Sequence, residues 1–186
     1  SCSIIKHANP CGFAVGDNNI QAFERAVSSD PVSYFGGIIG FNTKVSADLA
    51  EKLIEPFLEC IVAPEFSKES LEVFSKKKKL RLIKISENFK LSETMIKNAL
   101  GGYLLQDRDQ LDFDISKCEI ATNKAPTKIE MSALSLGWKL VKYVKSNAIV
   151  FSNNNQLLSV GAGQMSRVDS VKNAIRKISE TGLSLN

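Results

Sequence analysis

The stretch that decides the fold is Ser33-Tyr34-Phe35-Gly36-Gly37-Ile38-Ile39-Gly40-Phe41, an apolar run with glycines at its entry. It predicts a buried strand, and the glycines leave room for a ligand to approach the backbone. A helical pattern follows over residues 46–57, and Cys60-Ile61-Val62-Ala63 is the next short apolar run. Strand, helix and strand in this order predict an α/β protein with a βαβ arrangement and a mostly parallel or mixed sheet.

The same alternation continues on both sides of this unit. The further elements expected in the first half are a strand at Ser3-Ile4-Ile5, a helix over 20–28 that ends at Asp30-Pro31, a helix over 67–74 capped by Ser67, and a strand over 80–85. We expect these elements to form a first subdomain, residues 1–106.

A polar stretch over residues 107–128 predicts a connection to a partial second subdomain, residues 129–186, with one short strand expected at 118–121. The second subdomain is expected to hold a helix over 131–145 with Leu134, Trp138 and Val141 on one stripe, a hairpin of strands 147–151 and 157–160, and a last helix opened by Ser166. In that helix Asp169 would complete a short capping box, and the residues expected to face the core are Val168, Val171, Ile175 and Ile178.

Composition and charge favour an ordinary globular protein. The chain has 186 residues, 44% of them hydrophobic and 24% charged, and a net charge of +4. This mild excess of positive charge suits the binding of an anionic small molecule and does not require a nucleic-acid partner. No apolar run approaches the roughly 20 residues of a membrane span, and no export signal opens the chain. Because the chain starts without methionine, we expect it to be a fragment.

The cysteines give no indication of a disulfide framework or a metal site. Cys2, Cys11, Cys60 and Cys118 are scattered without a close pair, which fits a reducing, cytoplasmic setting. A zinc deaminase would need His-x-Glu followed by Pro-Cys-x-x-Cys. Here His7-Ala8-Asn9 lacks the glutamate and the second cysteine is absent, so we expect no metal.

Two loops contain candidate functional residues. His7, the single histidine, follows Lys6 where a strand breaks into a turn, and histidine is the side chain that most readily exchanges a proton near neutral pH. The second loop, Gly161-Ala162-Gly163, leads into a helix N-terminus, which favours an anion. Arg167 opposes the dipole of that helix, so an anionic ligand or a carboxylate partner would explain it. Structural explanations remain open: a hydrogen-bonded histidine and a solvated arginine.

Four separated motifs resemble one family. They are Lys6-His7-Ala8-Asn9-Pro10-Cys11-Gly12, Asp30-Pro31-Val32-Ser33-Tyr34-Phe35-Gly36-Gly37, Ile61-Val62-Ala63-Pro64, and Lys142-Tyr143-Val144-Lys145-Ser146-Asn147-Ala148-Ile149-Val150 together with Gly161-Ala162-Gly163-Gln164-Met165-Ser166-Arg167-Val168-Asp169. In this order they closely resemble the AICAR transformylase part of the bacterial bifunctional purine biosynthesis proteins, whose second activity is inosinate (IMP) cyclohydrolase.

The resemblance implies a cytidine-deaminase-like three-layer fold without zinc, and a homodimer. It also implies formyl transfer from 10-formyltetrahydrofolate, the co-substrate, to AICAR on the way to inosinate. His7 would be the general base, Lys6 its electrostatic partner, and Asn147 would orient the formyl oxygen or the substrate. The positions similar to nucleotide contacts are Phe35, Gly36, Glu59 and Arg167, with Lys78 reaching a phosphate across the dimer, and Val168 would lie beside the folate.

Departures from the family bear on activity. The cyclohydrolase domain, the Arg-Tyr-Gly-Glu-Asn-Pro-His-Gln segment and the part of the family that follows the last helix near Gly182 are not in this sequence. In the family, that segment and the part after the helix carry much of the phosphate and folate site, so we expect the chain alone to be inactive. Two interpretations stay open: an enzyme fragment with half of a formyltransferase site, or a non-catalytic remnant that binds a nucleotide or a partner chain.

Overall fold

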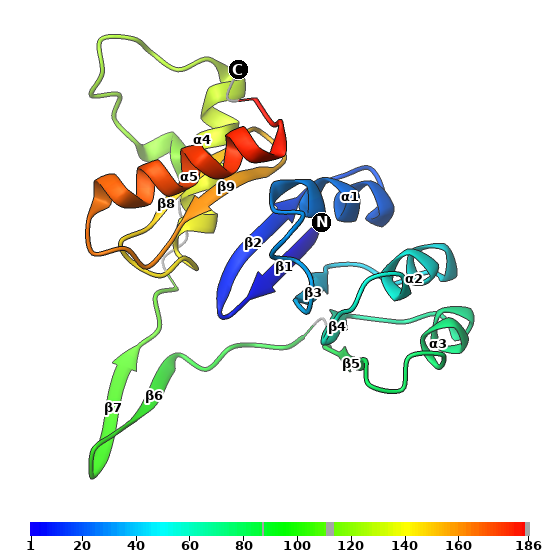
Figure 1. Cartoon of the computed structure of the whole chain (residues 1–186). Coiled ribbons are helices and arrows are strands. Elements are labelled where there is room, and N and C mark those ends of the chain that lie inside the picture. The colour runs from blue at the N-terminus through cyan, green and yellow to red at the C-terminus, as the bar shows by residue number, and fades with distance from the viewer. Residues whose placement is uncertain (87, 111–113, 185–186) are drawn as a thin grey trace.

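A five-stranded mixed sheet forms the first half of the molecule (Figure 1). The computed structural model describes residues 1–86, 88–110 and 114–184. The strands are β1 (Cys2–Lys6), β2 (Asn9–Ala14), β3 (Ile38–Phe41), β4 (Cys60–Ala63) and β5 (Arg81–Lys84), in the spatial order β2-β1-β3-β4-β5. β1 is antiparallel to β2 and β3, whereas β3, β4 and β5 run parallel, so the predicted α/β class and mixed sheet are confirmed.

Three helices cover one face of this sheet, as Figure 1 shows: α1 (Asn19–Ser29), α2 (Ala47–Ile54) and α3 (Lys68–Phe74). The side chains of Asn18 and Ser67 accept hydrogen bonds from backbone N–H groups in the first turns of α1 and α3, which satisfies donors that a helix start leaves unpaired. Strand and helix side chains that meet between the layers are fully buried; they include Ile4, Ile39, Ile61, Leu49 and Leu53.

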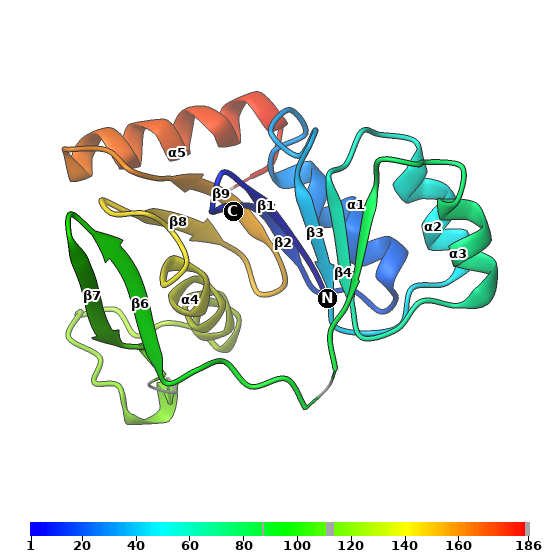
Figure 2. The ribbon, with the colours of Figure 1, turned by 90° about the horizontal axis from the view of Figure 1, so that it is seen from below.

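The second half is a hairpin between two helices. Strands β8 (Ile149–Ser152) and β9 (Leu157–Gly161) pair antiparallel, and α4 (Lys128–Val141) and α5 (Arg167–Thr181) lie on opposite sides of them (Figure 2). The hairpin and both helices were expected from the sequence and are confirmed. α4 begins with a complete capping box, in which Thr127 and Glu130 each accept from the other's backbone N–H.

Strand β9 lies beside β2, so the two halves are in direct contact. Ala14 and Gln156 form an isolated bridge, and the Val15 N–H donates to the Asn155 carbonyl over 2.7 Å. The buried side chain of Gln156 donates to the Arg25 carbonyl of α1 over 2.8 Å. These bonds join the first sheet and α1 to the β8–β9 hairpin.

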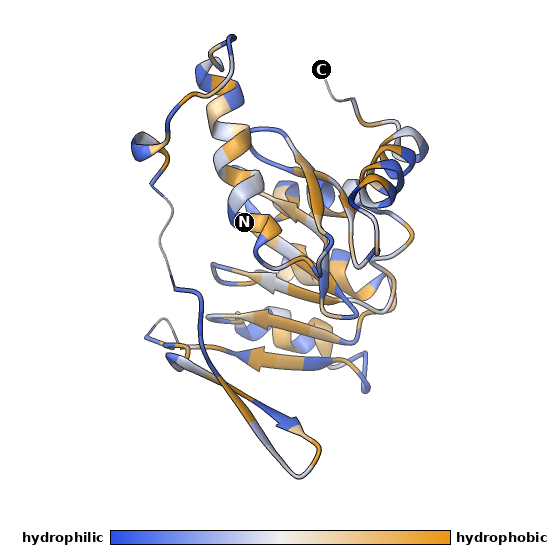
Figure 3. Ribbon diagram, turned by 90° about the vertical axis from the view of Figure 1, so that its left-hand side faces the viewer, coloured by the Kyte–Doolittle hydropathy of each residue, from blue (hydrophilic) through white to orange (hydrophobic). Residues whose placement is uncertain are grey.

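A second hairpin, β6 (Thr94–Ala99) with β7 (Gly102–Asp107), projects from the body (Figure 1). Every residue of β7 is exposed, including Leu104 and Leu105. The strands of the five-stranded sheet are largely apolar and are orange in Figure 3. Two of their residues, Ile38 of β3 and Ile83 of β5, are exposed. The β6–β7 hairpin is not predicted by the sequence analysis.

The strand expected at residues 118–121 is wrong, because that stretch has no regular structure in the described part of the chain. It follows a short 3-10 helix, η1 (Ile115–Lys117), and pairs with no strand of the three sheets formed by the described residues. Residues 111–113 of the same connection lie outside the described residues.

The core-facing residues predicted for α5 are wrong in part, and the stripe predicted on α4 lies largely at the surface. On α4, Leu134 and Trp138 are exposed, while Leu140 is buried. On α5, Val168 and Ile175 are exposed. Ile178 is buried as predicted, and the other two buried positions of α5 are the small residues Ser170 and Ala174, which contact β9.

The capping box predicted at the start of α5 is also wrong, since the side chain of Ser166 accepts no capping hydrogen bond. Among the described residues, no helix combines the length and the hydrophobicity that crossing a membrane requires.

Candidate active site

His7 lies at the tip of a strained turn. β1 and β2 are joined by the two residues His7 and Ala8, whose φ angles are 49° and 65°. Two-residue hairpin loops need positive φ to match the twist of the strands, but this region is costly for residues with a Cβ atom. The turn leaves His7 exposed. Strained backbone of this kind is concentrated at functional sites.

Lys6 is held by the glycine turn that precedes β3. Its Nζ donates to the carbonyl oxygens of Phe35, over 2.7 Å, and Gly36, over 3.2 Å. Gly36 has a φ of 65°, and a Cβ built there would lie 3.0 Å from Lys6 Nζ. The Gly36 N–H donates to the Phe57 carbonyl over 2.7 Å, which fixes the turn. The glycine is therefore needed both for the turn and for the close approach of the lysine.

Asn147 is held by the loop that precedes α5. Its Nδ2 donates to the carbonyl oxygens of Gln164 and Met165, each over 2.9 Å, and its backbone N–H also donates to Gln164. The peptide bond between Ser146 and Asn147 is cis. Because both partners of the side-chain nitrogen are acceptors, the orientation of the amide is settled. Among the described residues Oδ1 accepts no hydrogen bond, so it is the amide atom that can bind a ligand N–H.

Asn9 brings these two loops together. Its Oδ1 accepts from the backbone N–H of Lys145 over 2.9 Å, and its Nδ2 donates to the His7 carbonyl over 3.4 Å. One side chain thus contacts both the turn with His7 and the segment that leads to Asn147. The structure places Lys6, His7 and Asn147 on adjacent loops, although 140 residues separate His7 from Asn147 in the sequence.

Glu59 and Lys78 lie at contacts of the glycine turn: Glu59 bonds Gly37, and Lys78 lines the same cavity as Phe57. The Glu59 backbone N–H donates to the Gly37 carbonyl over 3.1 Å, while its carboxylate pairs with Arg81 over 2.8 Å. Lys78 lines a cavity of about 360 Å³ between the lysine-rich loop 76–79 and the segment 56–58. The ring of Phe57 borders that cavity and packs on Phe35, with ring centroids 5.4 Å apart.

Arg167 and Val168 are exposed at the first turn of α5, directly after the loop that holds Asn147. In the part of the chain that the structure describes, the Arg167 side chain makes no ion pair or hydrogen bond, so the carboxylate partner considered from the sequence is not there. Its exposed guanidinium is available to an anionic ligand.

Three of the four cysteine thiols, those of Cys2, Cys11 and Cys60, are poorly suited to act as nucleophiles or metal ligands. Burial raises the pKa of Cys11 to about 11, and the negative charge of Asp30 adds to this. Burial also raises the pKa of the Cys2 and Cys60 thiols. Within the described ranges, no three His, Cys, Asp or Glu residues lie close enough to hold a metal ion.

Sequence reasoning missed two residues of the site. Asn9 stood within a quoted motif, but its contact with Lys145 crosses from one half of the chain to the other and has no local signature. Phe57 supports the glycine turn through its carbonyl oxygen, which any residue could supply. Only the fold reveals either role.

The fold and the two loops define an α/β protein whose polar site is built from both halves of the chain. Residues 1–177 match the model of the AICARFT/IMPCHase bienzyme family. The chain belongs to this family, which confirms the resemblance seen in its motifs.

Three relatives give the extent of the similarity, and each carries the name "Bifunctional purine biosynthesis protein PurH". The Aquifex aeolicus (strain VF5) protein is 46% identical over 185 residues, covering 99% of this chain and 36% of the relative. The Bacillus cereus (strain AH187) protein is 47% identical over 177 residues, with 95% and 35% covered. The Thermoanaerobacter sp. (strain X514) protein is 43% identical over 173 residues, with 93% and 34% covered. The chain spans about a third of the length of these relatives.

Proposed function

We propose that this chain carries part of an AICAR formyltransferase site, which transfers a formyl group from 10-formyltetrahydrofolate to the 5-amino group of AICAR in purine biosynthesis. The observation that carries the proposal is the hydrogen bond from Lys145 to Asn9, which sets the loop of Lys6 and His7 against the loop of Asn147. The family match and the purine biosynthesis names of the relatives support the choice of reaction.

His7 acts as the general base in this proposal. The amine of AICAR is conjugated to a ring and a carboxamide, so it is a poor nucleophile and gains from a base near neutrality. As the amine attacks the formyl carbon, His7 removes its proton, and the carbonyl oxygen gains negative charge. That oxyanion then collapses, the bond from the formyl carbon to the folate nitrogen breaks, and the proton that His7 took from the amine passes to that nitrogen, which releases tetrahydrofolate and neutral His7.

Lys6 and Asn147 have complementary tasks. The Lys6 ammonium, fixed by two carbonyl oxygens, is a preorganised positive charge for the developing oxyanion. Both N–H bonds of Asn147 Nδ2 are directed at loop carbonyls, so its free Oδ1 is suited to the amine of the substrate rather than to the formyl oxygen. Of the two roles considered from the sequence, this favours orientation of the substrate.

The remaining assignments belong to the same proposal. The residues assigned to the nucleotide are Phe35, Gly36, Glu59, Arg167 and Lys78, and Val168 is assigned to the folate. The exposed guanidinium of Arg167 supports the nucleotide role, and the ion pair of Glu59 with Arg81 would have to open for a ligand. The fold is proposed to be cytidine-deaminase-like, with subdomains 1–106 and 129–186 joined by residues 107–128, in a cytoplasmic homodimer.

A full-length chimera tests the proposed reaction. This chain replaces the matching segment of the Aquifex aeolicus relative, and tetrahydrofolate release is measured with AICAR and 10-formyltetrahydrofolate, together and singly. We expect release only when both substrates are present. The 186-residue chain assayed alone should release none, because it spans about a third of the relative.

Two results would oppose the proposal. A chimera that folds and binds AICAR without transferring the formyl group would favour the alternative, a non-catalytic remnant that binds a nucleotide or a partner chain. Turnover by the 186-residue chain alone would show that the site is complete without the rest of the relative's length.

A further inference from the structure

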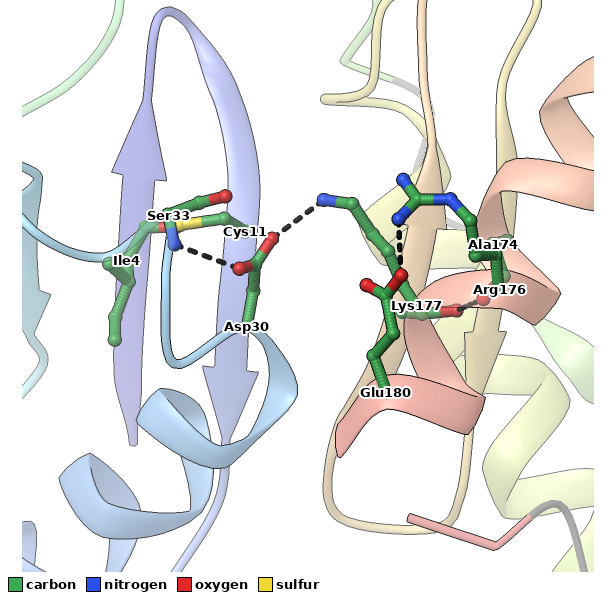
Figure 4. Close-up of polar contacts among 9 residues, drawn as sticks. Ile4, Cys11, Asp30, Ser33, Ala174, Arg176, Lys177 and Glu180 are labelled. Carbon is green, nitrogen blue, oxygen red and sulfur yellow. Dashed lines mark hydrogen bonds and ion pairs between the residues drawn. The ribbon is translucent and has the colours of Figure 1, made fainter. Parts of the chain in front are cut away.

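The carboxylate of Asp30 connects the two elements that hold the loops of the candidate site, namely the glycine turn before β3 and helix α5. Asp30 lies at the end of α1, and Figure 4 shows its carboxylate between the Ser33 amide and the Lys177 side chain of α5. Oδ1 accepts from the Ser33 N–H over 2.8 Å, and Oδ2 accepts from Lys177 Nζ over 2.6 Å. The Asp30 side chain is 10% exposed, which sets this pair apart from the other, mostly solvated ion pairs.

On one side, Asp30 shapes the turn that holds Lys6. The Ser33 N–H bonds the Asp30 carboxylate, the Tyr34 N–H bonds the Asp30 carbonyl over 3.4 Å, and the Gly37 N–H bonds the Tyr34 carbonyl over 2.9 Å. These bonds define the path of the chain through Phe35 and Gly36. The carbonyl oxygens of those two residues are the acceptors of the Lys6 ammonium.

On the other side, Asp30 holds the helix that supports Asn147. Lys177 and Ser170 both belong to α5, and the fully buried hydroxyl of Ser170 donates to the Asn147 carbonyl over 2.8 Å. The loop that accepts both N–H bonds of Asn147 Nδ2 leads directly into this helix. A helix is a stiff element, so its position relative to α1 also sets the position of Asn147.

We propose that Asp30 is a positioning residue; this inference rests on the proposed function. Asp30 fixes the glycine turn that binds Lys6 relative to helix α5, which binds Asn147. Burial works to raise the pKa of Asp30, but the hydrogen bonds from Lys177 and Ser33 outweigh it and lower the pKa. The carboxylate is therefore charged at neutral pH and bonds both partners at once.

Amide hydrogen exchange on the 186-residue chain tests the coupling without using activity. The reporters are the hydrogen-bonded amides of Gly36, in the glycine turn, and of Asn147, which α5 binds. In Asp30→Asn, both should exchange about tenfold faster or more, with a smaller change at the core amide of Ile61. The matched control is Glu180→Gln, which removes the exposed pair of Glu180 with Arg176 on the same helix and should leave both amides within about twofold of the parent.

The variant Lys177→Met distinguishes coupling through Asp30 from a local effect of replacing Asp30 itself. It leaves the bond between Asp30 and Ser33 intact, so faster exchange at Gly36 can arise only through Asp30. We expect Gly36 and Asn147 both to exchange faster in Lys177→Met, and Lys177→Arg to restore the parent rates. Acceleration at one amide only, or equal acceleration of all amides including Ile61, would overturn the proposal.

A second arm connects the coupling to turnover. In the full-length chimera, Asp30→Asn should lower kcat by about tenfold or more with KM less affected, because misplacement of reacting groups costs rate. Parent-like turnover in Asp30→Asn, beside a large loss in His7→Ala, would overturn the positioning role and leave the proposed function standing. Parent-like turnover in His7→Ala would instead oppose the proposed function.

Discussion

The Asn147 amide can be tested by two substitutions of different severity. Asn147→Ala removes the hydrogen bonds to Gln164 and Met165, whereas Asn147→Asp sets a negative carboxylate against the same two carbonyl oxygens. We therefore expect Asn147→Asp to reduce turnover of the full-length chimera at least as much as Asn147→Ala. Steady-state kinetics of both variants checks the order. A more active Asp variant would mean that the amide is not held by those carbonyls in the active protein.

The ion pair of Asp30 with Lys177 predicts a pH dependence of stability. The folded-state pKa of Asp30 lies below its ordinary value of 3.8, so the pair contributes fully above that value and its contribution is lost as pH falls through the lower folded-state pKa. Asp30→Asn should lower the free energy of unfolding by about 1–3 kcal/mol at pH 7. Urea unfolding from pH 7 to pH 3 should show the two proteins converging below pH 4. A constant difference across that range would show that the carboxylate charge is not the source.

The contact of α5 with β9 depends on one glycine. A Cβ at Gly161 would lie 1.8 Å from the Ser170 carbonyl oxygen, whereas a Cβ at Gly102 of β7 meets no atom within 4 Å. Gly161→Ala must push α5 away from the hairpin, so we expect a loss of stability of about 3 kcal/mol or more. Gly102→Ala is the matched control and should change stability by less than about 0.5 kcal/mol. Thermal unfolding checks both, and equal effects would contradict this packing.

Secondary structure with a strong local pattern could be predicted from the sequence. β4 was expected at its observed bounds, and α3 was expected with Ser67 as its cap. β2 was missed because Pro10 interrupts its pattern, and β6–β7 was missed because its apolar residues do not face the core. On α5, Ile178 is buried as expected but Val168 and Ile175 are exposed, because the contact with β9 also uses the small residues Ser170 and Ala174.

The two loops of the site could be identified from their residue types, but their contact could not. Strand, histidine and glycine patterns indicated where each loop lies along the chain. What joins them, the amide of Asn9 and the carboxylate of Asp30, depends on how β9 and α5 lie against β2 and α1. Such contacts between distant segments leave no periodic trace in one sequence.

Large apolar side chains are exposed on the β6–β7 hairpin, among them Ile96, Leu104 and Leu105, and a contiguous exposed apolar patch is typical of an interaction surface. We expect the chain to self-associate, with a dimer favoured because closed two-fold assemblies predominate. Light scattering at micromolar concentration should give a dimer mass for the parent and a lower mass for Leu104→Lys, whereas Lys97→Gln on the same hairpin serves as the control. A monomer mass for the parent with no concentration dependence would contradict this expectation.

The most direct test of the central claim is the turnover of the full-length chimera with His7 replaced. If His7 is the base that removes the proton of the amine, His7→Ala should lower kcat by roughly 10²- to 10⁴-fold while the protein still binds AICAR. The same loss should be absent in Glu180→Gln, which alters only an exposed pair on α5. A His7→Ala protein whose kcat stays within a few-fold of the parent would show that this histidine is structural and that the formyl transfer does not depend on it.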